Sequence, residues 1–374
     1  MDAANKTLVV KIGSSTLVGS DRAIDRAFLA GIAAQARKLR ELGWNLVVVS
    51  SGAVACGVPL LGFGERPHDM PSLQACASVG QCVLSAAWDE AMRACGLTSS
   101  LVLLTRHDTS RRSSYLYARD ALSRLLELGV VPIVNENDTT AVDEITFGDN
   151  DTLAALVSCL VSADLCVTLS DIDGLYTANP AIDPQARFIA QVDRIDASIV
   201  GAAGDSSTSV GTGGMITKIR AARILMTAGI RSVICSGEER DPLVRLAGGE
   251  RVGTLFVPPC TPRDVEPRKL WIALGDAAHG RLTVDAGAVE AMRERGSSLL
   301  PVGVTRVEGA FCAGDVLDVC SPDGFVLARG IAEADADTLV LAAGRHQDDI
   351  ASNRLLAHMA GRPAIHRDNL IVFA

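Results

Sequence analysis

Short apolar runs alternate with longer amphipathic stretches through the first 235 residues of the chain. The apolar runs are rich in aliphatic and β-branched residues, and their continuity predicts strands that are buried on both faces. These predicted strands cover residues 7–12, 45–50, 100–104, 130–134, 165–169 and 232–235. The amphipathic stretches predict helices near residues 24–42, 72–94, 113–128, 151–162 and 215–228. This alternation predicts an α/β fold with a mainly parallel sheet sandwiched by helices.

Glycines and polar residues occupy different ends of these predicted elements. Helices are followed by glycines, where a left-handed C-terminal residue is favoured, namely Gly43, Gly96, Gly129 and Gly229. Strands are followed instead by polar, glycine-rich segments, which read GSS, SSGA, NEND and SDIDG after the first, second, fourth and fifth strands. Ligands of parallel sheets bind at the carboxyl ends of the strands, so this edge is the candidate site.

The pattern changes after the proline-rich segment at residues 258–269, PPCTPRDVEPRK. We therefore expect a first domain at 1–260, a linker at 261–274 and a small, mainly β domain at 275–374. Strands of the second domain are predicted at residues 280–285, 315–320, 325–330 and 338–342. The turn PDG at 322–324 predicts a hairpin between the second and third of them.

Composition narrows the class of protein. The chain has 374 residues and a net charge of −9, which disfavours nonspecific binding to nucleic acid or anionic lipid. No apolar run reaches the roughly 18 to 20 residues that a membrane-spanning helix needs, so we expect a soluble, cytoplasmic protein.

The ten cysteines form no CxxC pair. Several, such as Cys159, Cys166 and Cys235, lie in apolar patterns, which indicates buried, reduced thiols rather than disulfides or a zinc site.

Carboxylates and amides gather at the start of the fourth predicted helix. The segment GDNDTLAAL places Asp149, Asn150 and Asp151 there, and NENDTT at 135–140 lies close by in the sequence. One acid at a helix start is ordinarily a cap or a partner of the helix dipole. Two acids and an amide on the ligand-binding edge exceed what capping requires, so we regard them as candidate site residues.

Two lysines lie beside glycine-rich turns, although lysines make up only five of the 35 basic residues. Lys11 ends the first strand, and Lys218 lies within GTGGMITKIRAA at 211–222. This segment is not a Walker A loop, because Thr217 precedes the lysine and Ile219 follows it. Phosphoryl transfer needs cations around the phosphate chain and a carboxylate that holds them in place. Lys11, Lys218 and Asp151 have the chemistry for those three roles.

Five ordered segments carry a resemblance to a known family. They are VVKIGSSTL (9–17), VVVSSGAVACG (47–57), VNENDTTAVDEITFGDNDTLAAL (134–156), LSDIDGLYTANP (169–180) and GTGGMITKIRAA (211–222). Together they resemble the amino acid kinase superfamily and, within it, the bacterial glutamate 5-kinases. The tail, with RGSSLLPVGV (295–304) and AIHRDNLIV (364–372), resembles the PUA domain that many of these kinases carry. The similarity runs from residue 7 to about 370.

The resemblance implies a role for each matching residue. Lys11 and Lys218 would bind the transferring phosphate, and Asp151 would organise both. Ser51, Asp138 and Asn150 would contact glutamate, with Asp138 suited to its ammonium group. ATP would be bound by Lys11, Ser170, Asp171 and the loop Thr212, Gly213, Gly214, Met215, Ile216, Thr217 and Lys218. Mg²⁺ would be held mainly by ATP, without a dedicated set of protein ligands.

The same resemblance implies an activity and partners. The reaction would phosphorylate the side-chain carboxylate of L-glutamate, giving L-glutamyl 5-phosphate in the first step of proline biosynthesis. It also implies a homo-oligomer, a tetramer or a dimer, with proline as a feedback inhibitor and glutamyl phosphate reductase as the next enzyme.

Two residues depart from the family pattern. Ser170 replaces the usual threonine but keeps its hydroxyl, and Asn179 replaces the usual aspartate, which we expect to shift ATP affinity modestly.

Two alternatives stay open from the sequence. The first is another member of the superfamily, such as an acetylglutamate or aspartate kinase or a kinase of nucleoside monophosphates. An acetylated substrate has no free ammonium, so Asp138 would then lack its partner. The second is an RNA-associated PUA protein. Fourteen acidic residues against nine arginines in 275–374 disfavour it, because phosphate contacts need clustered cations.

Overall fold

The computed structural model describes residues 5–19, 23–105, 112–140, 150–204, 214–259, 269, 272–273 and 278–373. The chain divides into two compact units, Met1–Pro262 and Arg263–Ala374, and each is described by itself. Within the described residues, no helix combines the length and apolar character that crossing a membrane requires.

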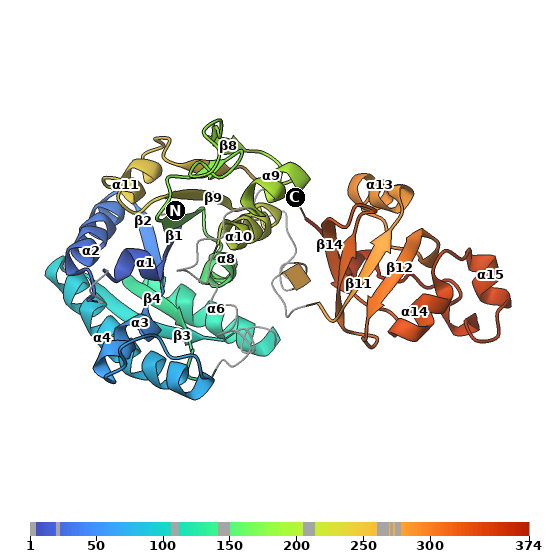
Figure 1. Cartoon of the computed structure of the whole chain (residues 1–374), viewed down its shortest axis with the longest axis horizontal. Coiled ribbons are helices and arrows are strands. Elements are labelled where there is room, and N and C mark those ends of the chain that lie inside the picture. The colour runs from blue at the N-terminus through green and yellow to red at the C-terminus, as the bar shows by residue number, and fades with distance from the viewer. Residues whose placement is uncertain are drawn as a thin grey trace. The chain divides into compact units, whose positions relative to one another are not determined.

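The first unit is built on an 8-stranded sheet (Figure 1). Its strand order is β3 (Thr98–Leu104), β4 (Val130–Glu136), β2 (Trp44–Ser50), β1 (Lys6–Ile12), β5 (Leu165–Ser170), β9 (Arg231–Ser236), β10 (Thr254–Phe256) and β8 (Gln191–Val192). The strands from β3 to β9 run parallel, as the alternating pattern predicts. Only β10 and β8 run in the opposite direction. A separate antiparallel pair joins β6 (Leu175–Tyr176) to β7 (Phe188–Ile189).

Helices cover both faces of this sheet. The described helices are α1 (Ser14–Leu17), α2 (Arg26–Glu41), α3 (Ala53–Leu60), α4 (Met70–Ala94), α6 (Arg112–Glu127), α8 (Asn150–Leu160), α9 (Ala197–Gly204), α10 (Met215–Thr227) and α11 (Pro242–Ala247). On one face α2 contacts β2, α4 and α11, and on the other α8 contacts β1, α6 and α10. The sheet is therefore sandwiched, and its predicted strands and helices are confirmed.

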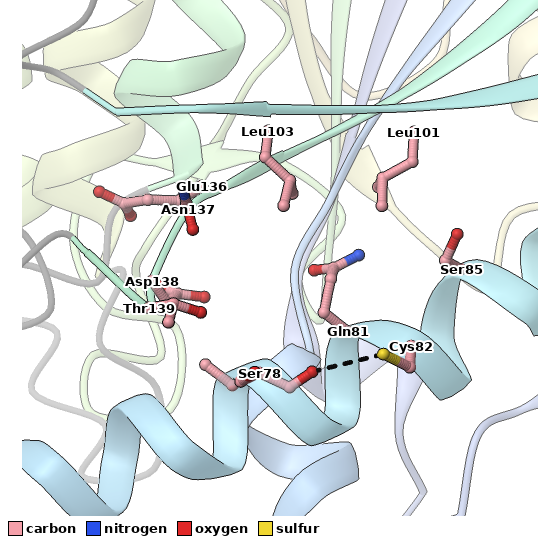
Figure 2. Close-up of a pocket in the computed structure, with 11 residues that line it drawn as sticks. Ser78, Gln81, Cys82, Ser85, Leu101, Leu103, Glu136, Asn137, Asp138 and Thr139 are labelled. Carbon is pink, nitrogen blue, oxygen red and sulfur yellow. Dashed lines mark hydrogen bonds between the residues drawn. The ribbon is translucent and has the colours of Figure 1, made fainter.

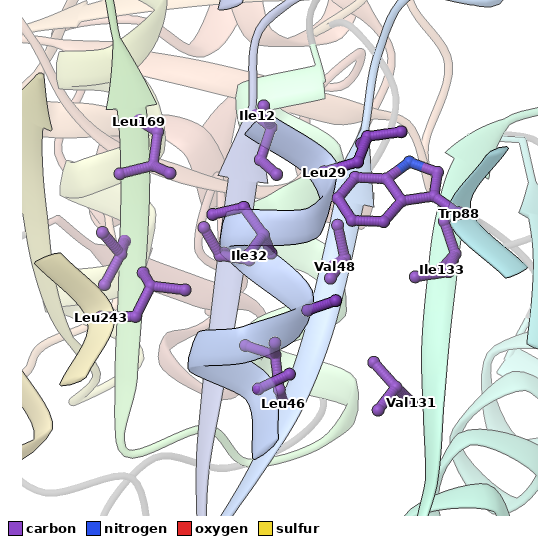
Figure 3. Close-up of a cluster of buried hydrophobic side chains, with 14 of the residues drawn as sticks. Ile12, Leu29, Ile32, Leu46, Val48, Trp88, Val131, Ile133, Leu169 and Leu243 are labelled. Atoms are coloured by element: carbon purple, nitrogen blue, oxygen red, sulfur yellow. The ribbon is translucent and has the colours of Figure 1, made fainter. Parts of the chain in front are cut away.

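Alternating side chains of the strands serve the two faces differently. Leu8, Val10 and Ile12 of β1 join the hydrophobic core on the α2 face, where Leu29 and Trp88 pack (Figure 3). Side chains alternate along a strand, so Lys11, between two of these core residues, points to the other face. That face is the one covered by α8 and α10, and the core packing of β1 thus directs Lys11 toward their N-terminal ends.

Close backbone contacts define the geometry around α3 and α4. A Cβ on Gly57 would lie 1.9 Å from the Cys76 carbonyl oxygen, and one on Gly80 would lie 1.9 Å from that of Ala53. Each helix therefore presents a glycine where the other helix's backbone approaches. This contact holds α4 against the turn that follows β2.

The predicted glycines after the helices are also confirmed, since all four have φ between 70° and 76°, for example Gly43 at 76°.

The second unit contains a 5-stranded sheet in the order β12 (Val304–Gly309), β11 (Gly280–Val284), β13 (Val316–Cys320), β14 (Val326–Ile331) and β15 (Leu370–Val372). The predicted hairpin through PDG is confirmed, because β13 and β14 pair antiparallel. The unit also has α13 (Ala286–Arg295), α14 (Ala336–Ala342), α15 (Gln347–Ser352) and the 3₁₀ turns Pro301–Gly303, Ala357–Met359 and Arg367–Asn369. Its apolar side chains form a core of their own.

The strand predicted at residues 338–342 is wrong, because this segment belongs to α14. Asp335 caps the helix by accepting a hydrogen bond from the Thr338 backbone N–H at 2.8 Å. Leu339 and Ala342 are buried, whereas Val340 between them is 57% exposed. Burial thus recurs at helical spacing, and the short apolar run did not distinguish this from a strand.

The cysteines that the sequence predicts to be buried thiols are buried and free. Cys159, Cys166 and Cys235 are all enclosed and carry no disulfide. Desolvation by burial raises the pKa of each thiol to about 12. The thiolate, which is the reactive form, is therefore strongly disfavoured at these positions.

Candidate active site

Asp151 joins the two candidate lysines at the carboxyl edge of the sheet. Lys11 Nζ lies 2.7 Å from Asp151 Oδ1, and Lys218 Nζ lies 3.6 Å from Asp151 Oδ2. The aspartate is in the first turn of α8, whereas Lys11 comes from β1 and Lys218 from the first turn of α10. The structure thus brings together the three residues that the sequence proposes for phosphoryl transfer.

This cluster is almost completely enclosed. The Asp151 side chain is 0% exposed, and those of Lys11 and Lys218 are 8% and 7% exposed. Thr217 Oγ1 lies 2.8 Å from Asp151 Oδ2 and 2.7 Å from the Gly214 carbonyl oxygen. The first turn of α10 therefore contributes both a lysine and a hydroxyl to the aspartate.

The charge balance of the cluster is positive. Burial alone would raise the pKa of Asp151, but the charges of Lys11 and Lys218, with hydrogen bonds from Lys11 and Thr217, lower it below its ordinary value. Asp151 is therefore ionised at neutral pH and faces two ammonium groups. Two cations around one carboxylate leave an excess of positive charge. The N-terminal ends of α8 and α10 add helix dipoles that also favour an anion.

Asn150, the residue before Asp151, is the centre of a second polar cluster. Its Nδ2 lies 2.8 Å from Ser51 Oγ, 3.0 Å from Asn135 Oδ1 and 3.2 Å from the Ser50 carbonyl oxygen. The proposed glutamate contacts Ser51 and Asn150 are thus in direct contact. Because Asn150 and Asp151 adjoin in α8, this cluster and the lysine cluster share the start of one helix.

Two residues of α4 support the amide cluster through hydrogen bonds that the sequence pattern does not predict. Trp88 donates a hydrogen bond from Nε1 to Ser50 Oγ at 3.0 Å. Asn135 donates from Nδ2 to Gln81 Oε1 at 2.7 Å. Both Gln81 and Trp88 are on α4, far in sequence from the strands they support. An amphipathic helix pattern gives no signal for such bonds, although the two residues share the side of α4 that faces the site.

Asp138 lines a pocket of about 360 Å³ between α4, β3 and the segment after β4 (Figure 2). Its other polar lining groups include Ser78, Gln81 and Asn137. Desolvation by burial raises the pKa of Asp138 to about 6, and the positive charge of Arg66 acts in the opposite direction. The carboxylate is thus costly to ionise where it lies, which suits a group that receives a cationic partner.

The residues proposed to bind ATP are described only in part. Thr212 and Gly213 lie outside the described residues, as does Asp149. Gly214 precedes α10 as its N-terminal cap residue, and Met215, Ile216, Thr217 and Lys218 form its first turn. Ser170 ends β5 and lies 2.9 Å through its Oγ from Asp171 Oδ1.

The two departures from the family pattern keep local hydrogen bonding. Ser170 retains a hydroxyl, and its backbone carbonyl accepts a hydrogen bond from the Gly237 N–H at 2.8 Å. Asn179 Oδ1 accepts from the Ala181 N–H at 3.0 Å. An aspartate oxygen accepts the same bond, so the replacement by Asn179 removes a charge and keeps the turn. The modest effect on ATP affinity stays a prediction.

Comparison with known proteins gives matches along nearly the whole chain. The model of the amino acid kinase family matches residues 6–236, and that of the PUA domain matches residues 280–352. The glutamate 5-kinase of Geobacter sp. (strain M21) is 44% identical over 98% of this chain and 97% of its own length. That of Pseudomonas putida (strain W619) is 45% identical over 98% of this chain and 98% of its own length. That of Burkholderia multivorans (strain ATCC 17616 / 249) is 43% identical over 99% of this chain and 98% of its own length.

Proposed function

This chain belongs to the amino acid kinase family, and we propose that within it the chain transfers the γ-phosphate of ATP to the side-chain carboxylate of L-glutamate. The products are L-glutamyl 5-phosphate and ADP, and the reaction is the first step of proline biosynthesis. The observation that carries this proposal is the contact of Asp151 with both Lys11 and Lys218. Support for the substrate comes from relatives of nearly equal length that are named glutamate 5-kinase.

The chemistry needs charge neutralisation rather than a general base. A glutamate side chain is already ionised at neutral pH, so its oxygen attacks the γ-phosphorus without losing a proton. A bond forms between that oxygen and phosphorus while the bond to the β,γ-bridging oxygen breaks, and ADP leaves. The main obstacle is repulsion between two anions. Lys11 and Lys218 are placed to lower it, because both lie in an enclosed site where charges interact strongly.

Asp151 acts in this scheme as a positioning residue. Its two oxygens face different lysines, so one carboxylate sets the separation of the two ammonium groups. Burial keeps the carboxylate from moving into solvent, and its lowered pKa keeps it ionised. The lysines are then preorganised for the transition state, which avoids reorganisation during the reaction.

The amino acid is assigned to the neighbouring polar residues. Asn150 and Ser51 lie beside the start of α8, next to the lysine cluster. Asp138 is suited to the ammonium group, because an adjacent cation favours the ionised form of a desolvated carboxylate. An acetylated substrate lacks this cation, so Asp138 favours a free amino acid.

We expect Mg²⁺ to enter the site mainly as a partner of ATP. Within the described residues, no group of three His, Cys, Asp or Glu side chains is placed to hold a metal ion. Asp151 is already engaged by two lysines, and Asp171, directly after β5, is the carboxylate among the proposed ATP contacts. The ion would supply further neutralisation of the phosphate charge when bound with ATP.

A substrate panel tests the proposed function. The protein is incubated with ATP, Mg²⁺ and hydroxylamine, and with L-glutamate, N-acetylglutamate or L-aspartate in separate reactions. An acyl phosphate reacts with hydroxylamine to give a hydroxamate, which is measured together with ADP. We expect hydroxamate with L-glutamate alone. Hydroxamate formed mainly from N-acetylglutamate or L-aspartate would overturn the substrate assignment.

A further inference from the structure

Three side-chain amides form a continuous chain from α4 to the start of α8. Gln81 Oε1 accepts from Asn135 Nδ2 at 2.7 Å, and Asn135 Oδ1 lies 3.0 Å from Asn150 Nδ2. Asn135 is only 1% exposed and Asn150 8% exposed, so water does not readily replace the bond between these two residues. The chain therefore connects a helix outside the lysine cluster to a proposed glutamate contact.

Backbone groups determine which way the two asparagine amides face. The Glu136 N–H donates to Asn135 Oδ1 at 2.9 Å, and only an oxygen can accept that bond. Asn135 must then turn its Nδ2 toward Gln81. The Ser50 carbonyl oxygen likewise requires a donor, so Asn150 turns its Nδ2 toward Ser50 and Asn135.

This orientation leaves a defined atom of Asn150 for a ligand. Its Nδ2 is engaged with Ser50, Ser51 and Asn135, and its Oδ1 receives no hydrogen bond within the described part of the chain. An amide oxygen is an acceptor, which suits the ammonium group of an amino acid. A rotated amide would present Nδ2 instead and would repel that group. The orientation of Asn150 therefore affects which substrate chemistry the site accepts.

We propose that Gln81 is a positioning residue for the amino acid substrate: by accepting from Asn135, it holds the Asn135 side chain where its Oδ1 meets Asn150 Nδ2, and so keeps Asn150 in place. This inference rests on the proposed function, because Asn150 acts there as a glutamate contact. Gln81 also lines the pocket that contains Asp138, and Figure 2 shows its amide extending from α4 toward β3. Both groups assigned to the ammonium end of glutamate are thus linked to one side of α4.

Gln81→Met tests this role, because methionine has a similar shape but cannot accept the Asn135 hydrogen bond with comparable strength. We expect the KM for glutamate to rise by about tenfold, with the KM for ATP changed by less than about twofold. A glutamate KM within about twofold of the wild-type value would overturn the inference.

A matched control separates positioning from general stability. Gln35 on α2 is buried, whereas Gln81 is half-buried, and Gln35 Oε1 accepts from the Leu243 N–H at 3.0 Å. Gln35→Met therefore removes a comparable bond that joins α2 to α11, away from the site. Both variants are expected to lower Tm, but only Gln81→Met should raise the glutamate KM. Equal effects of both variants on that KM would contradict a positioning role.

A double-mutant cycle tests the route of the effect. If Gln81 acts through Asn135 on Asn150, then Gln81→Met should add less than about twofold to the glutamate KM in an Asn150→Ala background. A full tenfold further increase would contradict this route. Wild-type protein is assayed first, so that loss of the proposed function can be recognised separately. Absence of glutamate-dependent ADP release in the wild type refutes the function, whereas an active enzyme that is insensitive to Gln81→Met refutes only this inference.

Discussion

Lys11 Nζ lies 2.7 Å from Asp151 Oδ1, across the boundary between the central strand β1 and the first turn of α8. Neither residue is accessible enough for water to screen the pair effectively. The second carboxylate oxygen faces Lys218 and Thr217 of α10. One aspartate therefore ties together a strand and two helices, and it also arranges the charges that the proposed reaction needs.

Replacement of Lys218 by alanine is expected to act on the chemical step. The variant should lower kcat by about 100-fold or more, since it removes charge stabilisation of the transition state. The KM for glutamate should stay nearly unchanged. Steady-state ADP release measures both constants. Lys38→Ala is the control, because Lys38 is exposed on α2 and pairs with Asp241. An unchanged kcat for Lys218→Ala would remove this lysine from the mechanism.

Replacement of Asp151 by asparagine is expected to impair folding as well as activity. It leaves two enclosed lysines without their carboxylate, and loss of one partner from a buried ion pair typically costs about 3–5 kcal/mol. Because the folded-state pKa of Asp151 is lowered, its stabilising contribution is present above the unfolded value near 3.9 and is lost as the pH falls through the folded value. Urea unfolding from pH 7 to pH 3 measures this. The gap between wild type and variant should shrink at acidic pH, and a gap that widens there would contradict the assignment.

Replacement of Asp138 by asparagine is expected to affect the binding of glutamate specifically. The variant keeps the shape of the side chain and removes the charge that would meet the ammonium group. We expect the glutamate KM to rise by about tenfold or more, while the ATP KM stays the same. Initial rates at varied glutamate and at varied ATP distinguish these results. An effect confined to the ATP KM would refute the role given to Asp138.

The raised pKa of Asp138 predicts a pH dependence. Burial raises the pKa to about 6, so the ionised form, which binds the ammonium group, is lost as the pH falls through that value. The wild-type glutamate KM should therefore rise between about pH 7 and pH 5. Asp138→Asn should flatten this profile. It should also raise Tm at pH 7, because a pKa above the unfolded value means that the ionised group destabilises the fold at neutral pH. A steep profile retained in the variant would assign the titration to another group.

Much of the first unit could be predicted because its strands are continuously apolar. A strand such as β1, buried along nearly its whole length, contrasts clearly with the amphipathic helices around it. Because parallel strands all end at the same edge of a sheet, the segments that follow them lie together at that carboxyl edge, namely GSS, SSGA, NEND and SDIDG. The contact of Lys11, Asp151 and Lys218 agrees with that reasoning, although each side chain alone had an ordinary explanation.

Other features required the three-dimensional structure. The segment 338–342 is apolar after Thr338, and the cap at Asp335 and the exposure of Val340 reveal a helix. The reversed strands β10 and β8 are too short to give a pattern. Gln81 could not be assigned, because its partner Asn135 belongs to a different element and amide pairing leaves no periodic signal.

Isotope transfer from glutamate to phosphate tests the central claim most directly. L-Glutamate labelled with ¹⁸O in its side-chain carboxylate is incubated with the protein, ATP, Mg²⁺ and hydroxylamine, and the released phosphate is examined by ³¹P NMR. If the carboxylate oxygen attacks the γ-phosphorus, hydroxylamine then cleaves the acyl carbon–oxygen bond, and the phosphate retains one labelled oxygen. We predict phosphate with one ¹⁸O in wild-type protein and little product from Lys218→Ala. Unlabelled phosphate from the wild type would show that water, not glutamate, receives the phosphoryl group.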